Sequence, residues 1–160
     1  KNTTLTKLNI SDNDHFDDDG LAHLKDLSDL ETLNLWHLKG ITGLGFVHLK
    51  GLTKLRELNL ADCHHIADSR FAYIKSMSAL ENLYIDNCPT ITDAAIAQLS
   101  DGPRLKELTL SGCEKLTDAT LIQFKSLKSL EYLDISNCVE MTDAGVRMIR
   151  KSLPDCTVIR

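Results

Sequence analysis

Four cysteines stand 25 residues apart, in a row that could bind a metal ion or form disulfides. They are Cys63, Cys88, Cys113 and Cys138. Parallel strands lie about 4.8 Å apart, so equivalent cysteines on adjacent strands are close enough for a disulfide. A zinc site, however, needs ligands that converge tetrahedrally, and thiols in a straight row do not converge. The row therefore indicates a structural role for a small, weakly hydrogen-bonding side chain at the turn after each strand.

A fifth cysteine, Cys156, lies outside this row and is the one thiol for which we expect reactivity. Five unpaired thiols are typical of a reducing compartment. We therefore predict a cytoplasmic protein, with the nucleus and the mitochondrial matrix as alternatives.

Two rows of charged residues repeat with the same period. The basic row could form a ridge that binds phosphate, but its members fall where helices should end, and the acidic row falls where helices should begin. Both rows are therefore explained by compensation of helix dipoles. The basic row is Lys25, Lys50, Lys75, Lys125 and Arg150, and the acidic row is Asp68, Asp93, Asp118 and Asp143.

The sequence carries no recognisable catalytic motif. It contains no H-E-x-x-H, no G-x-S-x-G and no glycine-rich phosphate loop, and its six histidines are scattered. The acidic stretch at residues 17–19 lacks the alternating ligands and the distal glutamate of a calcium loop. We therefore predict no enzymatic activity, no cofactor and no metal site.

Six repeats of 25 residues must position these rows. They start with leucines at residues 5, 30, 55, 80, 105 and 130, and each opens with a strand-like segment of the type L-x-x-L-x-[LI]. Apolar residues at helical spacing follow, such as Leu116, Leu121 and Phe124. Pairs such as Thr92-Asp93 stand where a helix should begin, because a threonine hydroxyl can cap free N–H groups. Each repeat therefore predicts a short strand, a turn and a helix.

One such unit cannot bury its apolar face, but stacked units can. The sequence predicts an α/β, right-handed solenoid in a horseshoe arc, with a parallel sheet on the concave face and helices on the convex face. We expect one domain over residues 1–160, with a terminal strand within residues 155–160 and a helix in the second repeat weakened by Gly43 and Gly45. Because the chain begins at Lys1 and solenoids need polar end caps, we expect a fragment of a longer protein whose first repeat frays first.

The segments CHHIADSRFAYI, CPTITDAAIAQL, CEKLTDATLIQF and CVEMTDAGVRMI resemble the cysteine-containing leucine-rich repeat. The resemblance covers residues 5 to about 155 and is strongest to the repeat arc of F-box proteins, which presents substrates to a ubiquitin ligase. It implies a leucine-rich repeat solenoid that binds proteins. The same repeat occurs in mitochondrial assembly factors and in bacterial proteins, and Leu38 departs from the pattern by occupying the cysteine position.

The composition argues against two kinds of partner, nucleic acids and membranes. A net charge of -5 and a pI near 5.6 argue against a general nucleic-acid binder. No apolar run has the length of a membrane span, so we expect no membrane insertion.

The concave face combines acidic and aromatic residues. Strand alternation points five positions of each repeat out of the core, and acids outnumber bases there. Ala61 follows Trp36 at the same position of the next repeat, which should leave room beside the ring. Asn9, Asn34 and Asn59 form a row whose amides we expect to bond one another along the sheet. The predicted protein-binding residues are Trp36, Glu57, Tyr84, Asp86, Glu107, Tyr132 and Asp134.

These observations favour a monomeric protein-interaction module that recognises a basic protein or peptide, with the substrate-recruiting arc of an F-box-type ubiquitin ligase as its most specific form. The alternatives are an assembly factor for a multiprotein complex, such as a mitochondrial one, and a bacterial repeat protein or effector. An enzyme with an unrecognised surface cluster is a third class. An upstream F-box or an arginine-rich presequence would separate the first two.

Overall fold

Seven three-residue strands form one parallel sheet in sequence order. The computed structural model describes residues 4–100 and 102–160, so residues 1–3 and 101 of the predicted domain lie outside the described part. Each strand pairs with its neighbour at a shift of 25 residues, as in Leu33↔Leu58 and Leu58↔Leu83. The strands are β1 (Lys7–Asn9), β2 (Thr32–Asn34), β3 (Glu57–Asn59), β4 (Asn82–Tyr84), β5 (Glu107–Thr109), β6 (Tyr132–Asp134) and β7 (Thr157–Ile159).

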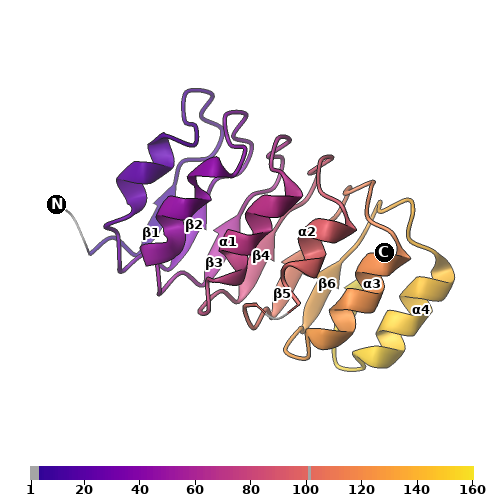
Figure 1. Cartoon of the computed structure of the whole chain (residues 1–160). Coiled ribbons are helices and arrows are strands. Elements are labelled where there is room, and N and C mark those ends of the chain that lie inside the picture. Colours follow the sequence, from indigo (N-terminus) through magenta and orange to yellow (C-terminus); the bar gives the residue numbers. More distant parts are fainter. Residues whose placement is uncertain (1–3, 101) are drawn as a thin grey trace.

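The helices all lie on one side of this sheet, and the other side is left uncovered (Figure 1). We call the uncovered side the open sheet face; it is the face predicted to be concave. The helical elements are η1 (Gly20–Leu24), η2 (Leu44–Gly51), η3 (Asp68–Arg70), α1 (Phe71–Lys75), α2 (Asp93–Ala97), α3 (Asp118–Gln123), η4 (Phe124–Ser126) and α4 (Asp143–Ser152).

The starts of the helices differ between the early and the late repeats. Thr92, Thr117 and Thr142 each accept a backbone N–H at the start of α2, α3 and α4, as the sequence predicts. η1, η2 and η3 begin without a side-chain cap, and these first turns are 3₁₀. Gly43 precedes η2 with a φ of 86°, which a β-carbon would oppose.

The core is a continuous stack of leucines and isoleucines between the sheet and the helices. The middle leucines of β2 to β6 are fully buried, whereas Leu8 in β1 is only partly buried. Val158 in β7 is 7% exposed, which confirms the predicted terminal strand. The stack holds the strands in register and thereby fixes the positions of the side chains on the open sheet face.

Candidate functional site

Two rows of side chains cross the open sheet face over β3 to β6. The strand register places Glu57, Asn82, Glu107 and Tyr132 in one row and Asn59, Tyr84, Thr109 and Asp134 in the next. Glu57 and Glu107 thus flank Asn82 on either side. The structure therefore brings together five of the seven predicted binding residues, Glu57, Tyr84, Glu107, Tyr132 and Asp134, on adjacent strands.

Tyr84 lies in the field of two carboxylates. Its hydroxyl donates to Glu107 Oε2 at 3.2 Å. Partial burial raises the pKa of Tyr84 to about 12, and the negative charges of Glu107 and Glu57 add to that rise. No hydrogen bond or ion pair of the Glu57 carboxylate is found within residues 4–100 and 102–160, so this group is available to a ligand.

Asp86 extends this patch beyond the ends of the strands. Its carboxylate accepts the Thr109 hydroxyl at 2.6 Å and the Ser111 N–H at 2.8 Å. Burial raises the pKa of Asp86, and the charge of Asp134 adds to the rise, although the bond from Thr109 opposes it. Because Asp86 ties two neighbouring repeats together, replacing it will affect stability as well as binding.

Trp36 lies apart from the acidic rows, on the turn after β2. Its indole Nε1 donates to Asp62 Oδ2 at 2.7 Å, and its ring meets His37 edge-on at 5.3 Å between centroids. The ring is 38% exposed, whereas Ala61 beside it is only 7% exposed. The indole therefore reaches across to the third repeat and takes up the room that the sequence suggested for a partner side chain.

The expectation for the asparagine row is wrong. The Oδ1 atoms of Asn9, Asn34 and Asn59 each accept the backbone N–H two residues further on, at 2.9 Å. An asparagine side chain readily makes this local turn, which competes with amide–amide bonds along the sheet. The row therefore shapes the turn after each strand.

The bases Arg56 and Lys106 at the edge of this face are both paired with one acid. Glu81 Oε2 lies 3.1 Å from Lys106 Nζ, and Glu81 Oε1 lies 3.8 Å from Arg56 Nη2. All three residues stand at the beginnings of strands, at the edge of the open sheet face. The centre of the face keeps its excess of carboxylates.

The cysteine row is structural, as predicted. Each thiol is buried and donates to a backbone carbonyl 28 residues earlier, such as Cys113 Sγ to Ile85 O at 3.1 Å. Burial raises the pKa of Cys63 to about 11 and that of Cys113 to about 12. Cys156, for which we expected reactivity, is itself only 8% exposed, and burial raises its pKa too. A raised pKa disfavours the reactive thiolate.

The aspartates at the helix starts do more than offset dipoles. Asp68 accepts both the N–H and the hydroxyl of Thr92 in the next repeat, at 2.9 and 2.5 Å. Asp93 bonds Thr117 in the same way and also accepts the hydroxyl of Thr120. These bonds join consecutive repeats, a role that helix-dipole reasoning did not predict.

Neither a metal centre nor a membrane span emerges from the described chain. Within residues 4–100 and 102–160, no three His, Cys, Asp or Glu side chains are arranged to hold a metal ion. In the same part of the chain, no helix has both the length and the apolar character needed to cross a bilayer.

Sequence comparison supports the repeat type. A family model described as "Leucine Rich repeat" matches residues 1–25, 51–69 and 126–149. Together with the 25-residue register of the parallel sheet, this decides the architecture. The chain has the leucine-rich repeat fold. No curated protein sequence matches it.

Solved leucine-rich repeat structures are similar to this chain. Internalin F of Listeria monocytogenes superposes with a TM-score of 0.66 at 21% identity over 86% of this chain, and internalin C2 of the same organism with 0.57 at 19% over 96%. TLR13, solved in a complex with ssRNA13, superposes with 0.63 at 24% over 85%. The chain spans 36%, 69% and 19% of these three proteins, respectively. At these identities the likeness shows the fold alone.

Proposed function

We propose that this leucine-rich repeat chain is a protein-interaction module whose open sheet face binds a basic protein or peptide. Leucine-rich repeats typically mediate protein–protein interaction, through an extended sheet surface. The observation that carries the proposal is the row in which Glu57 and Glu107 flank Asn82, with Tyr84 and Tyr132 beside them. Rigid aromatic rings anchor interfaces at low entropic cost, and unpaired carboxylates select and steer cations.

The geometry supports a specific mode of binding. A lysine or arginine side chain laid over Asn82 would reach Glu57 on one side and Glu107 on the other. Tyr84 and Tyr132 would cover the aliphatic part of that side chain and can stack on a guanidinium. Asp134 would contact a second cation one row further along the strands, and Asp86 would add to the field. Trp36 would cover the end of the ligand nearest the second repeat.

The experiment uses the single tryptophan as its probe. Trp36 emission is followed while short peptides that contain two or three lysines or arginines are titrated into the protein. We expect Glu57→Lys to weaken the tightest peptide at least tenfold, because it reverses an unpaired carboxylate at the centre of the face. The matched control is Glu114→Lys, which makes the same charge change at an exposed position in the turn after β5.

Two results would overturn this assignment. One is an unchanged affinity in Glu57→Lys, and the other is a loss of binding in Lys125→Glu on the helical side of the molecule. In the second case the helices form the binding surface. Melting temperatures of all variants are compared first, because Glu57 and Glu114 lie outside the core and their replacement should leave stability unchanged.

A more specific role is substrate recruitment to an F-box-type ubiquitin ligase in a reducing compartment, with the cytoplasm as the expected location. It is supported by the cysteine row and by five thiols without disulfides. If it is correct, a partner that binds the open sheet face accumulates in cells when this gene is deleted and loses its ubiquitylation. A stable, unmodified partner level would instead favour an assembly role.

A further inference from the structure

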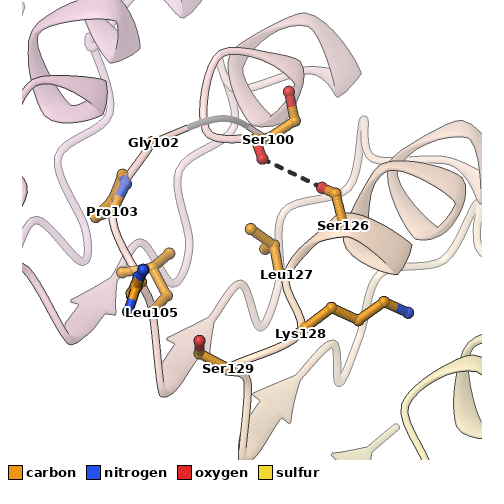
Figure 2. Close-up of a pocket in the computed structure, with 9 residues that line it drawn as sticks. Ser100, Gly102, Pro103, Leu105, Ser126, Leu127, Lys128 and Ser129 are labelled. Carbon is orange, nitrogen blue, oxygen red and sulfur yellow. Dashed lines mark hydrogen bonds between the residues drawn. The ribbon is translucent and has the colours of Figure 1, made fainter.

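A basic groove runs along the edge of the molecule where the strands begin. Two hollows of about 200 and 350 Å³ lie side by side there and share Arg104 and Ser129 in their walls. They are bounded by the loops that lead into β4, β5 and β6. Figure 2 shows the smaller hollow between the loop of Gly102 and Pro103 and the loop of Ser126 to Ser129.

The groove is the positive part of a negative protein. Among the described residues, four bases and one acid line the two hollows, which gives +3 from these five side chains in a chain whose net charge is -5. The acid is Glu81, and the bases are Arg56, Arg104, Lys106 and Lys128. None of these bases belongs to the row that ends the helices, so helix dipoles do not account for them.

Glu81 fixes two bases without neutralising the groove. It holds Lys106 at 3.1 Å and lies 3.8 Å from Arg56, so one carboxylate serves two cations. Arg104 is exposed and makes no ion pair or hydrogen bond within residues 4–100 and 102–160. Lys106 and Arg56 share the single carboxylate of Glu81, and the neighbouring Arg104 guanidinium adds a further charge. The groove therefore keeps positive charge that an anion can neutralise.

The loop before β5 sets Arg104 in place. Pro103 is buried, and Gly102 packs so closely on the end of α1 in the preceding repeat that a β-carbon on Gly102 would lie 3.2 Å from Lys75 Cα. This anchored Gly-Pro turn holds the backbone of Arg104 at the junction of both hollows. Figure 2 shows the Lys128 side chain running away from Pro103, so Lys128 contributes charge rather than a direct contact to the smaller hollow.

Hydroxyl groups complete the lining. Ser78 and Ser129 line the larger hollow, and Ser100 and Ser126 the smaller one. Ser126 Oγ already donates to a carbonyl, Gln123 O at 2.9 Å, and lies 3.3 Å from Ser100 O (Figure 2). Ser100 Oγ likewise donates to Ala97 O at 2.9 Å. The hydroxyls of Ser78 and Ser129 make no hydrogen bond to the described residues, so they can donate to a ligand.

We propose that this groove binds a phosphorylated side chain of a protein partner. A phosphate carries close to two negative charges and three acceptor oxygens, which match the cations Arg104, Lys106 and Arg56 better than a single carboxylate does. Arginine can bind two phosphate oxygens at once, and the serine hydroxyls can donate to the third.

The surroundings favour a phosphorylated side chain over a nucleic acid. In the described part of the chain, no aromatic side chain lines either hollow, so bases would have no surface on which to stack. The acidic rows of the open sheet face begin directly beside the groove, since Glu107 follows Lys106 and Glu57 follows Arg56. They would repel a long polyanion but leave room for a single phosphate group.

The test measures fluorescence anisotropy with a labelled nine-residue peptide that carries one phosphoserine among alanine and glycine, and with its unphosphorylated twin. We expect the phosphopeptide to bind at least tenfold more tightly than the twin. Arg104→Glu should abolish this difference, and Arg104→Lys should restore part of it. The matched control is Lys115→Glu, which makes the same charge change at an exposed position at the opposite edge and should leave the affinity within twofold.

Three outcomes would overturn the proposal: equal binding of both peptides, undiminished phosphopeptide binding by Arg104→Glu, and tighter groove-dependent binding of a nine-nucleotide single-stranded RNA. The last result would assign the groove to nucleic acid instead. Glu57→Lys should retain phosphopeptide binding, so this test does not depend on whether the open sheet face binds a basic partner.

Discussion

The aspartates Asp68, Asp93 and Asp118, at the starts of η3, α2 and α3, each join two consecutive repeats. A helix dipole alone would give Asp93 a contribution of under about 1 kcal/mol. The structure adds bonds from the Thr117 N–H and hydroxyl and from the hydroxyl of Thr120, which is fully buried. A buried hydroxyl that loses its partner costs about 1–3 kcal/mol. Asp93 therefore stabilises the contact between the fourth and fifth repeats.

We predict that Asp93→Ala lowers the free energy of unfolding by about 2 kcal/mol, because it leaves Thr120 without an acceptor. Asp143→Ala is the matched control: this residue holds the same position in α4, but its carboxylate is 76% exposed and contacts only Arg160 among the described residues. It should lose under about 1 kcal/mol. Urea unfolding of both variants measures the difference. Equal losses of unfolding free energy would show that Asp93 acts only through the helix dipole.

The same aspartate gives this loss a pH dependence. Burial alone would raise the pKa of Asp93, but the bonds from Thr120 and Thr117 hold it below its ordinary value of 3.8. A carboxyl whose pKa is lower in the folded state stabilises the fold above the ordinary value and loses that contribution as the pH falls through the folded value. The stability gap between wild type and Asp93→Ala should therefore narrow below pH 3.8.

At the scale of elements, the repeat period predicted the strands, and the structure confirms their number, order and burial. The helical parts of the first two repeats are only 3₁₀, and no side-chain cap forms at the start of either. The second repeat has a threonine at the capping position, Thr42, but Gly43 follows it with a left-handed φ of 86°. Only the glycines of the second repeat predicted a weakened helix. The turn after each of the strands β1 to β6 passes through a left-handed residue, such as Asp62 at a φ of 59° or Asn87 at 54°. The signal was present as Asp, Asn, Gly or His at one position of each repeat, since the first three types tolerate this conformation well.

The two edge strands should differ in stability. In β1 the central Leu8 is only partly buried, whereas in β7 Val158 is 7% exposed and its carbonyl accepts Arg150 Nη2 at 2.9 Å. We therefore predict that amide hydrogens of residues 7–12 exchange faster than those of β7, although both strands have a single neighbour, and much faster than those of β4. Hydrogen exchange followed by mass spectrometry measures this, and protection of residues 7–12 equal to that of β4 would contradict it.

At the scale of the whole molecule, charge is sorted between a negative sheet face and a positive edge. The sequence predicted the negative face, because strand alternation alone assigns Glu57, Glu107 and Asp134 to it. It did not predict the groove. Arg104 lies in a helix-to-strand loop, at a position that differs in charge from repeat to repeat, since Ala79 and Ser129 occupy it on either side. Its nearness to Arg56 and Lys106 arises only when the repeats stack. A search for like charges that repeat every 25 residues does not find a single base in such a loop.

The closeness of these two surfaces leads to a prediction about a single partner. Arg104 in the groove stands three residues before Glu107 on the sheet face, which is about 10 Å at about 3.3 Å per residue, so a linker of four to six residues can span both surfaces. Joining two ligands makes the second contact intramolecular and raises the affinity without any new contact. A peptide with one phosphoserine, such a linker and a cluster of lysines should therefore bind at least tenfold more tightly than either half alone.

Either Glu57→Lys or Arg104→Glu should return this joined peptide to the affinity of one half, and both together should remove binding. Anisotropy titrations at low and high salt provide the measurement, since both contacts are electrostatic and should weaken together as salt screens them. A one-residue linker, which cannot reach both surfaces, is the control. If the long linker gives no more affinity than the short one, the face and the groove serve different partners, because no single chain then occupies both at once.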